Sequence, residues 1–233
     1  MDFADTHVVV SGGTGALGTA VVHRLLEGGA VCHVPNLHGD ELQNFPHRKD
    51  PRVVVTSGID LTNEDQVKNY YDALPDLWAS IHIAGGFAMA PVTETSKDDF
   101  QSQMNMNALS CFLCCSNAAR ILRRKNIGGR MVNVAARPAL EPRTGAGMVA
   151  YTASKAAVAA LTEALGEELA ADGIWVNAVA PSIMDTPGNR AAMPDANHAL
   201  WPGVDEVAAT IVYLASPANG SARSAVVPVY GKS

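Results

Sequence analysis

The segment His7-Val-Val-Val-Ser-Gly-Gly-Thr-Gly-Ala-Leu-Gly18 decides the fold of this chain. Its β-branched residues predict a buried strand, and the glycines after them open a helical pattern from Thr19 to Glu27. A strand, a glycine-rich turn and a helix N-terminus in this order are typical of a pyrophosphate-binding site, because free backbone N–H groups face the anion. A glycine turn without a ligand is the alternative interpretation.

Each glycine of this turn has its own expected steric role. A side chain at Gly12 would block the tight turn, one at Gly15 the approach of a phosphate, and one at Gly18 the packing of helix on sheet. The expected cofactor contacts in the segment are Gly12, Thr14, Gly15, Ala16, Leu17 and Gly18.

Short β-branched segments alternate with longer helical patterns along the rest of the chain, which predicts βαβ units. No linker or repeat divides the chain, so we expect residues 1–233 to form one α/β domain. Its architecture should be a doubly wound parallel sheet of about seven strands flanked by helices. The expected strands after the first are Val31–Val34, Val53–Val55, Ala79–Ile83, Met131–Val134, Ile174–Val179 and Ser224–Val229. The expected helices cover Phe100–Arg124, Tyr151–Ala171 and Asp205–Ala215, with another opening at a capping box of Thr62 and Asp65 and a short one in the loop Pro35–Arg52.

The composition is that of a globular protein and disfavours several classes of function. Of 233 residues, 48% are hydrophobic and 17% charged, and the formal net charge is −6. An acidic chain without a block of like charges offers no basic surface, so we expect no nucleic-acid partner. No apolar segment approaches the roughly 18 to 20 residues of a membrane span, and the acidic start is unlike a signal peptide. We therefore expect no membrane association and a cytoplasmic location.

The four cysteines, Cys32, Cys111, Cys114 and Cys115, predict buried reduced thiols. Cys111-x-x-Cys114 has the spacing of a redox or zinc pair, but no second pair of ligands follows it. The neighbouring apolar residues suit a packed helix. We therefore expect no metal.

Tyr151-Thr-Ala-Ser-Lys155 places a phenol and an ammonium on one helix face. A free phenol has a pKa of about 10, which makes it a poor acid–base group at neutral pH. A lysine charge about 5 Å away is expected to lower that pKa by about two units. The pair therefore indicates proton exchange with an alcohol or carbonyl oxygen.

The glycine turn, this pair and Asn177-Ala-Val-Ala-Pro181 together resemble the short-chain dehydrogenase/reductase family over essentially the whole chain. The resemblance implies a Rossmann-type fold, an NAD(P) cofactor and Tyr151 as the acid–base group. It also implies that Lys155 tunes the tyrosine and binds the nicotinamide ribose, and that Asn107 anchors a relay water. Further implied cofactor contacts are Asp60, Leu61, Ala84, Gly85, Pro181, Ile183 and Thr186.

The chain departs from the family pattern at two places. In Val132-Asn-Val-Ala-Ala136, alanine stands where the family has the serine that hydrogen-bonds the reacting oxygen. Losing such a donor costs about 10² to 10³ in rate when nothing replaces it. Ser154 projects from a different helix face than the tyrosine, whereas Arg143 or Thr144 could reach the pocket. His82 stands where the family has asparagine, and we interpret it as a hydrogen-bonded strand residue.

One branch of the family, the dihydropteridine reductases, also lacks that serine. The segments similar to this branch are Gly12–Gly18, Ala84–Phe87, Gly147–Met148 and Asp185–Asp195. By contrast, Tyr151–Ala157 and Asn177–Pro181 resemble generic bacterial members. Reduction of a polarised C=N bond builds no alkoxide, so the missing serine fits a substrate of that chemical type.

The end of the second strand is expected to choose between NAD and NADP. Asn36 stands where an aspartate commonly binds the ribose 2′-hydroxyl, and its amide oxygen could accept that hydroxyl without repelling a phosphate. No basic residue follows directly, although His38, His47 or Arg48 could approach. These features favour NAD slightly.

Residues 185–203 are expected to form a lid over the carboxyl ends of the strands. Met193 and Trp201 could form an apolar wall for a small or flat substrate, or pack the lid onto the body. Arg190 is the charge best placed to meet an anionic substrate. With Ala136 and Thr144, these residues complete the expected substrate site.

The sequence thus predicts an NAD(P)-dependent oxidoreductase that transfers hydride between nicotinamide and a small carbonyl/alcohol or a quinonoid dihydropteridine-like substrate. A non-catalytic dinucleotide-binding sensor or scaffold is the alternative. The missing serine favours the scaffold, and the presence of Asn107, Tyr151 and Lys155 together argues against it. The family resemblance also implies a homodimer or homotetramer that associates through the long helices.

Overall fold

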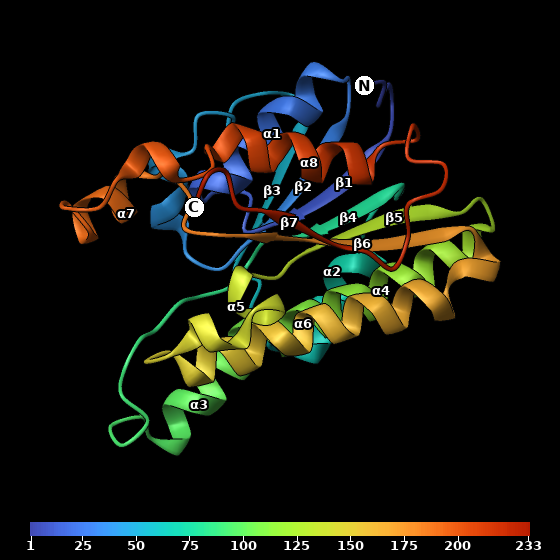
Figure 1. Cartoon of the computed structure of the whole chain (residues 1–233). Helices are drawn as coiled ribbons and strands as arrows, with labels where there is room; N and C mark the ends of the chain where they lie inside the picture. Colours follow the sequence, from blue (N-terminus) through green and yellow to red (C-terminus); the bar gives the residue numbers. More distant parts are fainter.

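The computed structural model describes all residues from 1 to 233 and contains one seven-stranded parallel sheet (Figure 1). The order across the sheet is β3-β2-β1-β4-β5-β6-β7, which confirms the predicted Rossmann-type α/β fold. The chain changes direction between β1 and β4, where a doubly wound sheet opens a crevice at the carboxyl ends of its strands. The strands are β1 (His7–Ser11), β2 (Val31–Asn36), β3 (Val53–Ser57), β4 (Ala79–His82), β5 (Gly129–Val134), β6 (Ile174–Pro181) and β7 (Val226–Val229).

Helices cover both faces of the sheet (Figure 1). α1 (Ala16–Glu27) and α8 (Val204–Ala215) pack together on one face, and α2 (Glu64–Asp72), α4 (Ser110–Lys125) and α6 (Val149–Glu168) cover the other. Side chains alternate along a strand, so Val8 and Val10 join the core of the first face and Val9 that of the second. The sheet is therefore buried between two hydrophobic layers.

The predicted helix Phe100–Arg124 is a helical run with a change of pitch. It comprises α3 (Lys97–Gln103), a π-helical turn (Met104–Leu109) and α4. π-helical turns are rare and occur frequently at functional sites. This one carries Asn107, a residue assigned to the site from the sequence.

Most predicted boundaries differ from the structure by one to three residues, and two of these differences have a local cause. α2 begins at Glu64, and its N-cap is Asn63, whose side chain accepts the backbone N–H of Gln66. The expected capping box at Thr62 is wrong because the Thr62 hydroxyl donates to Asp60 instead, at 2.7 Å. The last strand begins at Val226 rather than Ser224, which has a left-handed φ of 54°.

No helix is long and apolar enough to cross a bilayer. Several short helical segments lie in the loops between the main strands and helices. The predicted lid has ends that are tied together, because Asp185 pairs with Gly203 and its N–H donates to the Pro202 carbonyl at 3.0 Å. The short segments are Gly39–Asn44, α5 (Arg137–Leu140), Pro142–Gly145, Ala170–Asp172, α7 (Pro187–Ala192) and His198–Leu200.

Candidate functional site

The glycine turn between β1 and α1 leaves no room for a Cβ at Gly12, Gly13 or Gly18 and is open at Gly15. A Cβ on Gly13 would lie 2.9 Å from the Val34 side chain. Gly12 has a φ of +68°, and a Cβ there would lie 2.7 Å from the backbone nitrogen of Ala84. A Cβ on Gly18 would overlap the Gly12 carbonyl, so the backbone of the turn excludes it, rather than the sheet as predicted. A Cβ on Gly15 would meet only that carbonyl oxygen, at 3.5 Å. The free space at Gly15 fits the approach of a phosphate to the N-terminus of α1.

Thr14, Asn36 and Glu41 form a hydrogen-bonded group that we call the β2 corner. The Thr14 hydroxyl and the Asn36 amide both donate to Glu41 Oε2, at 2.7 and 3.0 Å. Asn36 is buried, and its Oδ1 has no partner. A buried acceptor left unpaired costs about 1 to 3 kcal/mol. A ribose hydroxyl would satisfy this atom, so the residues present fit the adenosine end of a dinucleotide.

Glu41 is the residue of this corner that sequence reasoning missed. It lies in the 3₁₀ segment Gly39–Asn44, which follows β2 and brings the carboxylate to Thr14. The acidic pair Asp40-Glu41 shortly after β2 was the available signal. Two of the three basic residues that could have approached the ribose are engaged elsewhere, because Arg48 donates to the carbonyls of its own loop and His47 stacks on His23. The third, His38, is exposed, and its side chain has no hydrogen bond.

Asn107 holds the turn Ala84–Gly86 against α6. Its Oδ1 accepts the Gly86 N–H, and its Nδ2 donates to the Gly86 carbonyl and to Ser154 Oγ, each at 3.0 Å. The side chain is 1% exposed. The amide therefore fixes the turn after β4, and its assignment as a water anchor stays a prediction.

Asn107, Tyr151 and Lys155 converge at one place, which we call the α6 corner. A Cβ on Gly85 would overlap Asn107 Oδ1 and would lie 3.4 Å from Lys155 Nζ. Lys155 Nζ lies 6.0 Å from the centroid of the Tyr151 ring and donates to the Val134 carbonyl at 2.8 Å. The four-residue spacing on α6 thus brings the phenol and the ammonium to one side of the helix.

Burial dominates the charge states at this corner. It raises the pKa of Tyr151 to about 12 and lowers the pKa of Lys155 to about 8, the latter opposed by the nearby Cys111 thiol. The expected lowering of the tyrosine pKa is therefore contradicted. The physical reason is that desolvation penalises the phenolate, while the ammonium is held by Val134. The raised pKa keeps Tyr151 protonated at neutral pH.

Neither candidate for replacing the family's serine is hydrogen-bonded to the α6 corner: Thr144 is hydrogen-bonded within its own loop, and Arg143 is exposed and its side chain has no hydrogen bond or ion pair. Ala136 is buried and has no polar side chain, and the exposed Thr144 donates its hydroxyl to the Glu141 carbonyl at 2.8 Å. Ser154 Oγ donates to the Tyr151 carbonyl, also at 2.8 Å. His82 is hydrogen-bonded to Ser80 and Asn133, which confirms its interpretation as a strand residue with hydrogen-bond partners.

Side chains of the predicted lid, residues 185–203, contact one another. Arg190 forms a two-bonded ion pair with Asp185, at 2.5 and 2.8 Å, which neutralises the charge expected to meet an anionic substrate. The His198 and Trp201 rings are tilted at 45° with centroids 4.6 Å apart, and His198 Nε2 lies 2.8 Å from the Met193 carbonyl. Met193 and Trp201 are therefore linked through this histidine within the lid.

The remaining cofactor candidates line the carboxyl ends of β3 and β6. Asp60 accepts both the N–H and the hydroxyl of Thr62, and Thr186 Oγ1 accepts the Asn189 N–H at the start of α7. Leu61 is half-buried, Pro181 ends β6, and Ile183 is exposed.

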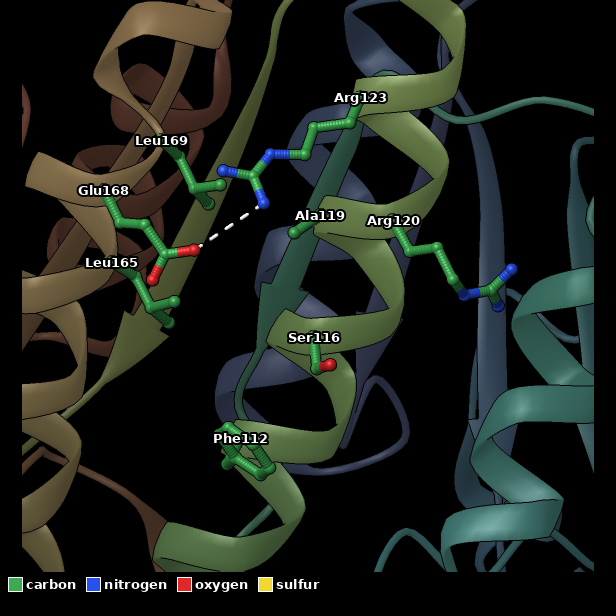
Figure 2. A pocket seen from close by; sticks show the side chains of 8 residues that line it. All are labelled: Phe112, Ser116, Ala119, Arg120, Arg123, Leu165, Glu168 and Leu169. Atoms are coloured by element: carbon green, nitrogen blue, oxygen red, sulfur yellow. Dashed lines mark ion pairs between the residues drawn. The ribbon is translucent and has the colours of Figure 1, made fainter.

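An outer pocket lies between α4 and α6, away from these corners (Figure 2). Arg123 and Glu168 form an ion pair of 3.6 Å across it. The Phe112 ring at one end is 45% exposed. The lining residues are Phe112, Ser116, Ala119, Arg120, Arg123, Leu165, Glu168 and Leu169.

Residues 6–197 match the family of short chain dehydrogenases. The chain belongs to this family. It is therefore an NAD(P)-dependent oxidoreductase. The chain is 31% identical to an NADPH-dependent aldehyde reductase-like chloroplastic protein of Arabidopsis thaliana over 198 residues, 76% of this chain and 72% of that one.

Two further similarities concern a curated relative and a solved structure. Identity is 30% with 3beta-hydroxysteroid dehydrogenase 2 of Eggerthella lenta over 187 residues, 76% of this short-chain dehydrogenase and 70% of the relative. The solved structure of ElxO with NADP bound superposes with a TM-score of 0.87 at 22% identity, covering 97% of this chain and 98% of that one. The structural likeness supports the fold.

Proposed function

We propose that this short-chain dehydrogenase reduces a small carbonyl or a quinonoid dihydropteridine-like substrate, with Tyr151 as the proton donor. The neutral, partly buried phenol of Tyr151 beside the Lys155 ammonium is the observation that supports this most strongly. A phenol that holds its proton at neutral pH suits the reductive direction.

The proposed chemistry divides between cofactor and protein. A bound reduced nicotinamide supplies the hydride. Tyr151 gives its hydroxyl proton to the substrate oxygen or nitrogen, and the Lys155 ammonium stabilises the phenolate left behind. Asn107 fixes the turn after β4 through its two hydrogen bonds to Gly86, and the missing side chain at Gly85 lets this turn approach the asparagine and the lysine closely. Tyr151 then regains a proton from solvent.

The residues around Tyr151 support a flat substrate. Phe87 packs its ring edge against the Tyr151 ring with centroids 5.0 Å apart, and Phe87 is 61% exposed. This aromatic surface lies next to the proposed proton donor. No hydroxyl stands at Ala136 to hold an alkoxide, so a C=N bond within a planar heterocycle is the substrate chemistry that we favour.

We further propose NAD rather than NADP as the cofactor. At the β2 corner, Glu41 Oε2 could accept a ribose 2′-hydroxyl, whereas a 2′-phosphate would meet its negative charge. The unpaired Asn36 Oδ1 offers a second acceptor for a hydroxyl. This preference would set the protein apart from its NADPH-dependent relative.

We propose that a second copy of the chain covers the pocket between α4 and α6. The exposed Phe112 and the opposite charges of Arg123 and Glu168 give this face both apolar and complementary polar contacts (Figure 2). Sedimentation of the wild-type protein and Phe112→Asp at equal concentrations should show a dimer or tetramer that the variant loses. A cytoplasmic location, with the four thiols reduced, completes the proposal.

The experiment that tests the proposed function is Tyr151→Phe. Removing the phenolic proton should lower kcat by about 10² to 10⁴, the range for a positioned acid. NADH affinity and the unfolding temperature should stay unchanged, because the phenol hydroxyl has no hydrogen-bond partner in the protein. Unchanged turnover would remove Tyr151 from its role.

A further inference from the structure

Three soft metal-ligating side chains meet in the core beneath the α6 corner. They are His82 at the end of β4 and Cys111 and Cys115 on α4. One ligand atom from each lies within 4.8 Å of the others, and all three residues are buried. The two cysteines are one helical turn apart, so their thiols project from the same side of α4 toward the strand.

The His82 ring is oriented by its neighbours. Its Nε2 lies 2.8 Å from Ser80 Oγ, which in turn contacts the Tyr71 hydroxyl at 2.7 Å. Its Nδ1 faces the cysteine side, 3.3 Å from Cys115 Sγ and 2.7 Å from Asn133 Oδ1. Metal-ligating histidines commonly have their second ring nitrogen fixed by such a hydrogen bond.

We propose that His82, Cys111 and Cys115 bind a zinc-class divalent ion, with the Asn133 amide oxygen beside them as the fourth donor. Imidazole and thiolate donors without a carboxylate are typical of zinc rather than magnesium or calcium. Zinc–sulfur bonds of about 2.3 Å in a tetrahedron place two sulfurs about 3.8 Å apart. The three ligand atoms, which lie within 4.8 Å of one another, and the 3.3 Å distance from Cys115 Sγ to His82 Nδ1 are close to that geometry.

The charges balance in such a site. Both thiols release their protons when the ion binds, so two thiolates neutralise one divalent cation. The imidazole stays neutral, because its proton moves from Nδ1 to Nε2, and the Nε2–H then donates a hydrogen bond to Ser80 Oγ. A neutral complex avoids the large cost of an unpaired charge in the core.

Cys114 provides a matched contrast within the same helix. It contacts the tyrosine pair Tyr70 and Tyr71 rather than His82. Of the Cys111-x-x-Cys114 pair considered in the sequence, only Cys111 therefore belongs to the proposed site. The proposed pair, Cys111 and Cys115, has the spacing of one full helical turn and takes its third ligand from the neighbouring strand. The alternative is a hydrogen-bonded packing cluster that binds no ion.

The test uses the full chain, reduced and freed of metal with a chelator, and Co²⁺ as the spectroscopic probe. Cobalt is added to the folded protein and, separately, during refolding, because the site is buried. The expected result is one Co²⁺ per chain with thiolate-to-cobalt charge-transfer absorption and tetrahedral d–d bands. Zn²⁺ should displace the cobalt and raise the unfolding temperature.

Variants assign the ligands. Cys115→Ala and His82→Asn should weaken binding at least tenfold, whereas Cys114→Ala should bind as the wild type does. His82→Asn places the family's own residue at the site and retains hydrogen-bonding groups, so it should fold even if Cys115→Ala does not. Absence of thiolate–cobalt absorption in both wild-type preparations would overturn the proposal. The same absorption in folded His82→Asn with undiminished affinity would also overturn it.

Discussion

The β2 corner and the α6 corner lie on the same edge of the sheet but are built in opposite ways. At the β2 corner, the exposed Glu41 carboxylate is held by two neutral donors from a turn and a strand end. At the α6 corner, the buried Lys155 ammonium has one backbone carbonyl as its hydrogen-bond acceptor. One corner presents a solvated anion, and the other retains a desolvated cation.

Under the proposed function, the β2 corner governs the choice of cofactor and the α6 corner governs proton transfer. An exposed charge interacts weakly through water, so the β2 corner can bias the choice between two cofactors by a modest factor. Burying a charge lowers the free energy of unfolding. A buried ammonium at Lys155 in spite of this cost is consistent with a role for its charge at the site. Removing the charge of Lys155 should therefore affect turnover and stability together, whereas removing the charge of Glu41 should affect cofactor preference alone.

Among the variants that compare the two corners, the largest effect is expected from the charge change Lys155→Met. Turnover should fall by about 10²-fold or more, because the phenolate of Tyr151 loses its cation. At pH 7 the variant should be more stable by about 2 kcal/mol. Relief of the lowered lysine pKa contributes about 3 kcal/mol, offset by about 1 kcal/mol for the lost hydrogen bond to Val134. Urea unfolding measures the difference.

The free energy of unfolding of the wild-type protein should depend on pH through Lys155. The pKa of Lys155 falls from 10.5 to about 8 on folding, so between these values the unfolded chain binds the proton more tightly. Raising the pH through this window should stabilise the wild-type protein relative to the variant. A constant difference from pH 7 to pH 10.5 would show that the ammonium carries no burial penalty.

A smaller effect, confined to cofactor binding, is expected from Gly15→Ala. A Cβ fits there in the free protein, so the variant should fold normally while its NADH affinity falls at least about tenfold through the blocked phosphate. Gly18→Ala is the matched control, since its Cβ meets the backbone of the turn and should destabilise the fold by about 1 to 3 kcal/mol. Equal NADH affinity in Gly15→Ala and the wild type would place the phosphate elsewhere.

The smallest effect is expected from Glu41→Gln. Removing the carboxylate should improve NADPH binding about tenfold and leave turnover with saturating NADH unchanged. Asp40→Asn, one residue earlier on the same exposed segment, controls for the general loss of negative charge. An identical shift in both variants would mean that Glu41 acts through net charge rather than through contact.

The sequence predicted the features that local spacing determines. The strand, glycine turn and helix order gave the fold, and the four-residue step on α6 correctly brought Tyr151 and Lys155 together. Their pKa values were not predictable, because desolvation depends on the helices packed around them. Glu41 was missed because its position depends on how the loop after β2 folds back.

Local spacing was equally insufficient for the cluster of His82, Cys111 and Cys115 and for the N-cap of α2. The contact of Cys115 with His82 joins α4 to β4 over 33 positions of sequence, and no local pattern shows which side of the helix faces the strand. At α2, both Thr62 and Asn63 have side chains that can cap a helix. The competing bond from Thr62 to Asp60 decided between them.

The measurement that tests the central claim most directly is a parallel fluorescence titration of the wild-type protein with NADH and NADPH. An open glycine turn next to the Glu41 carboxylate predicts low-micromolar binding of NADH and at least about tenfold weaker binding of NADPH. Tighter binding of NADPH would contradict the role of the β2 corner. No binding of either dinucleotide up to millimolar concentration would contradict the assignment of the site itself.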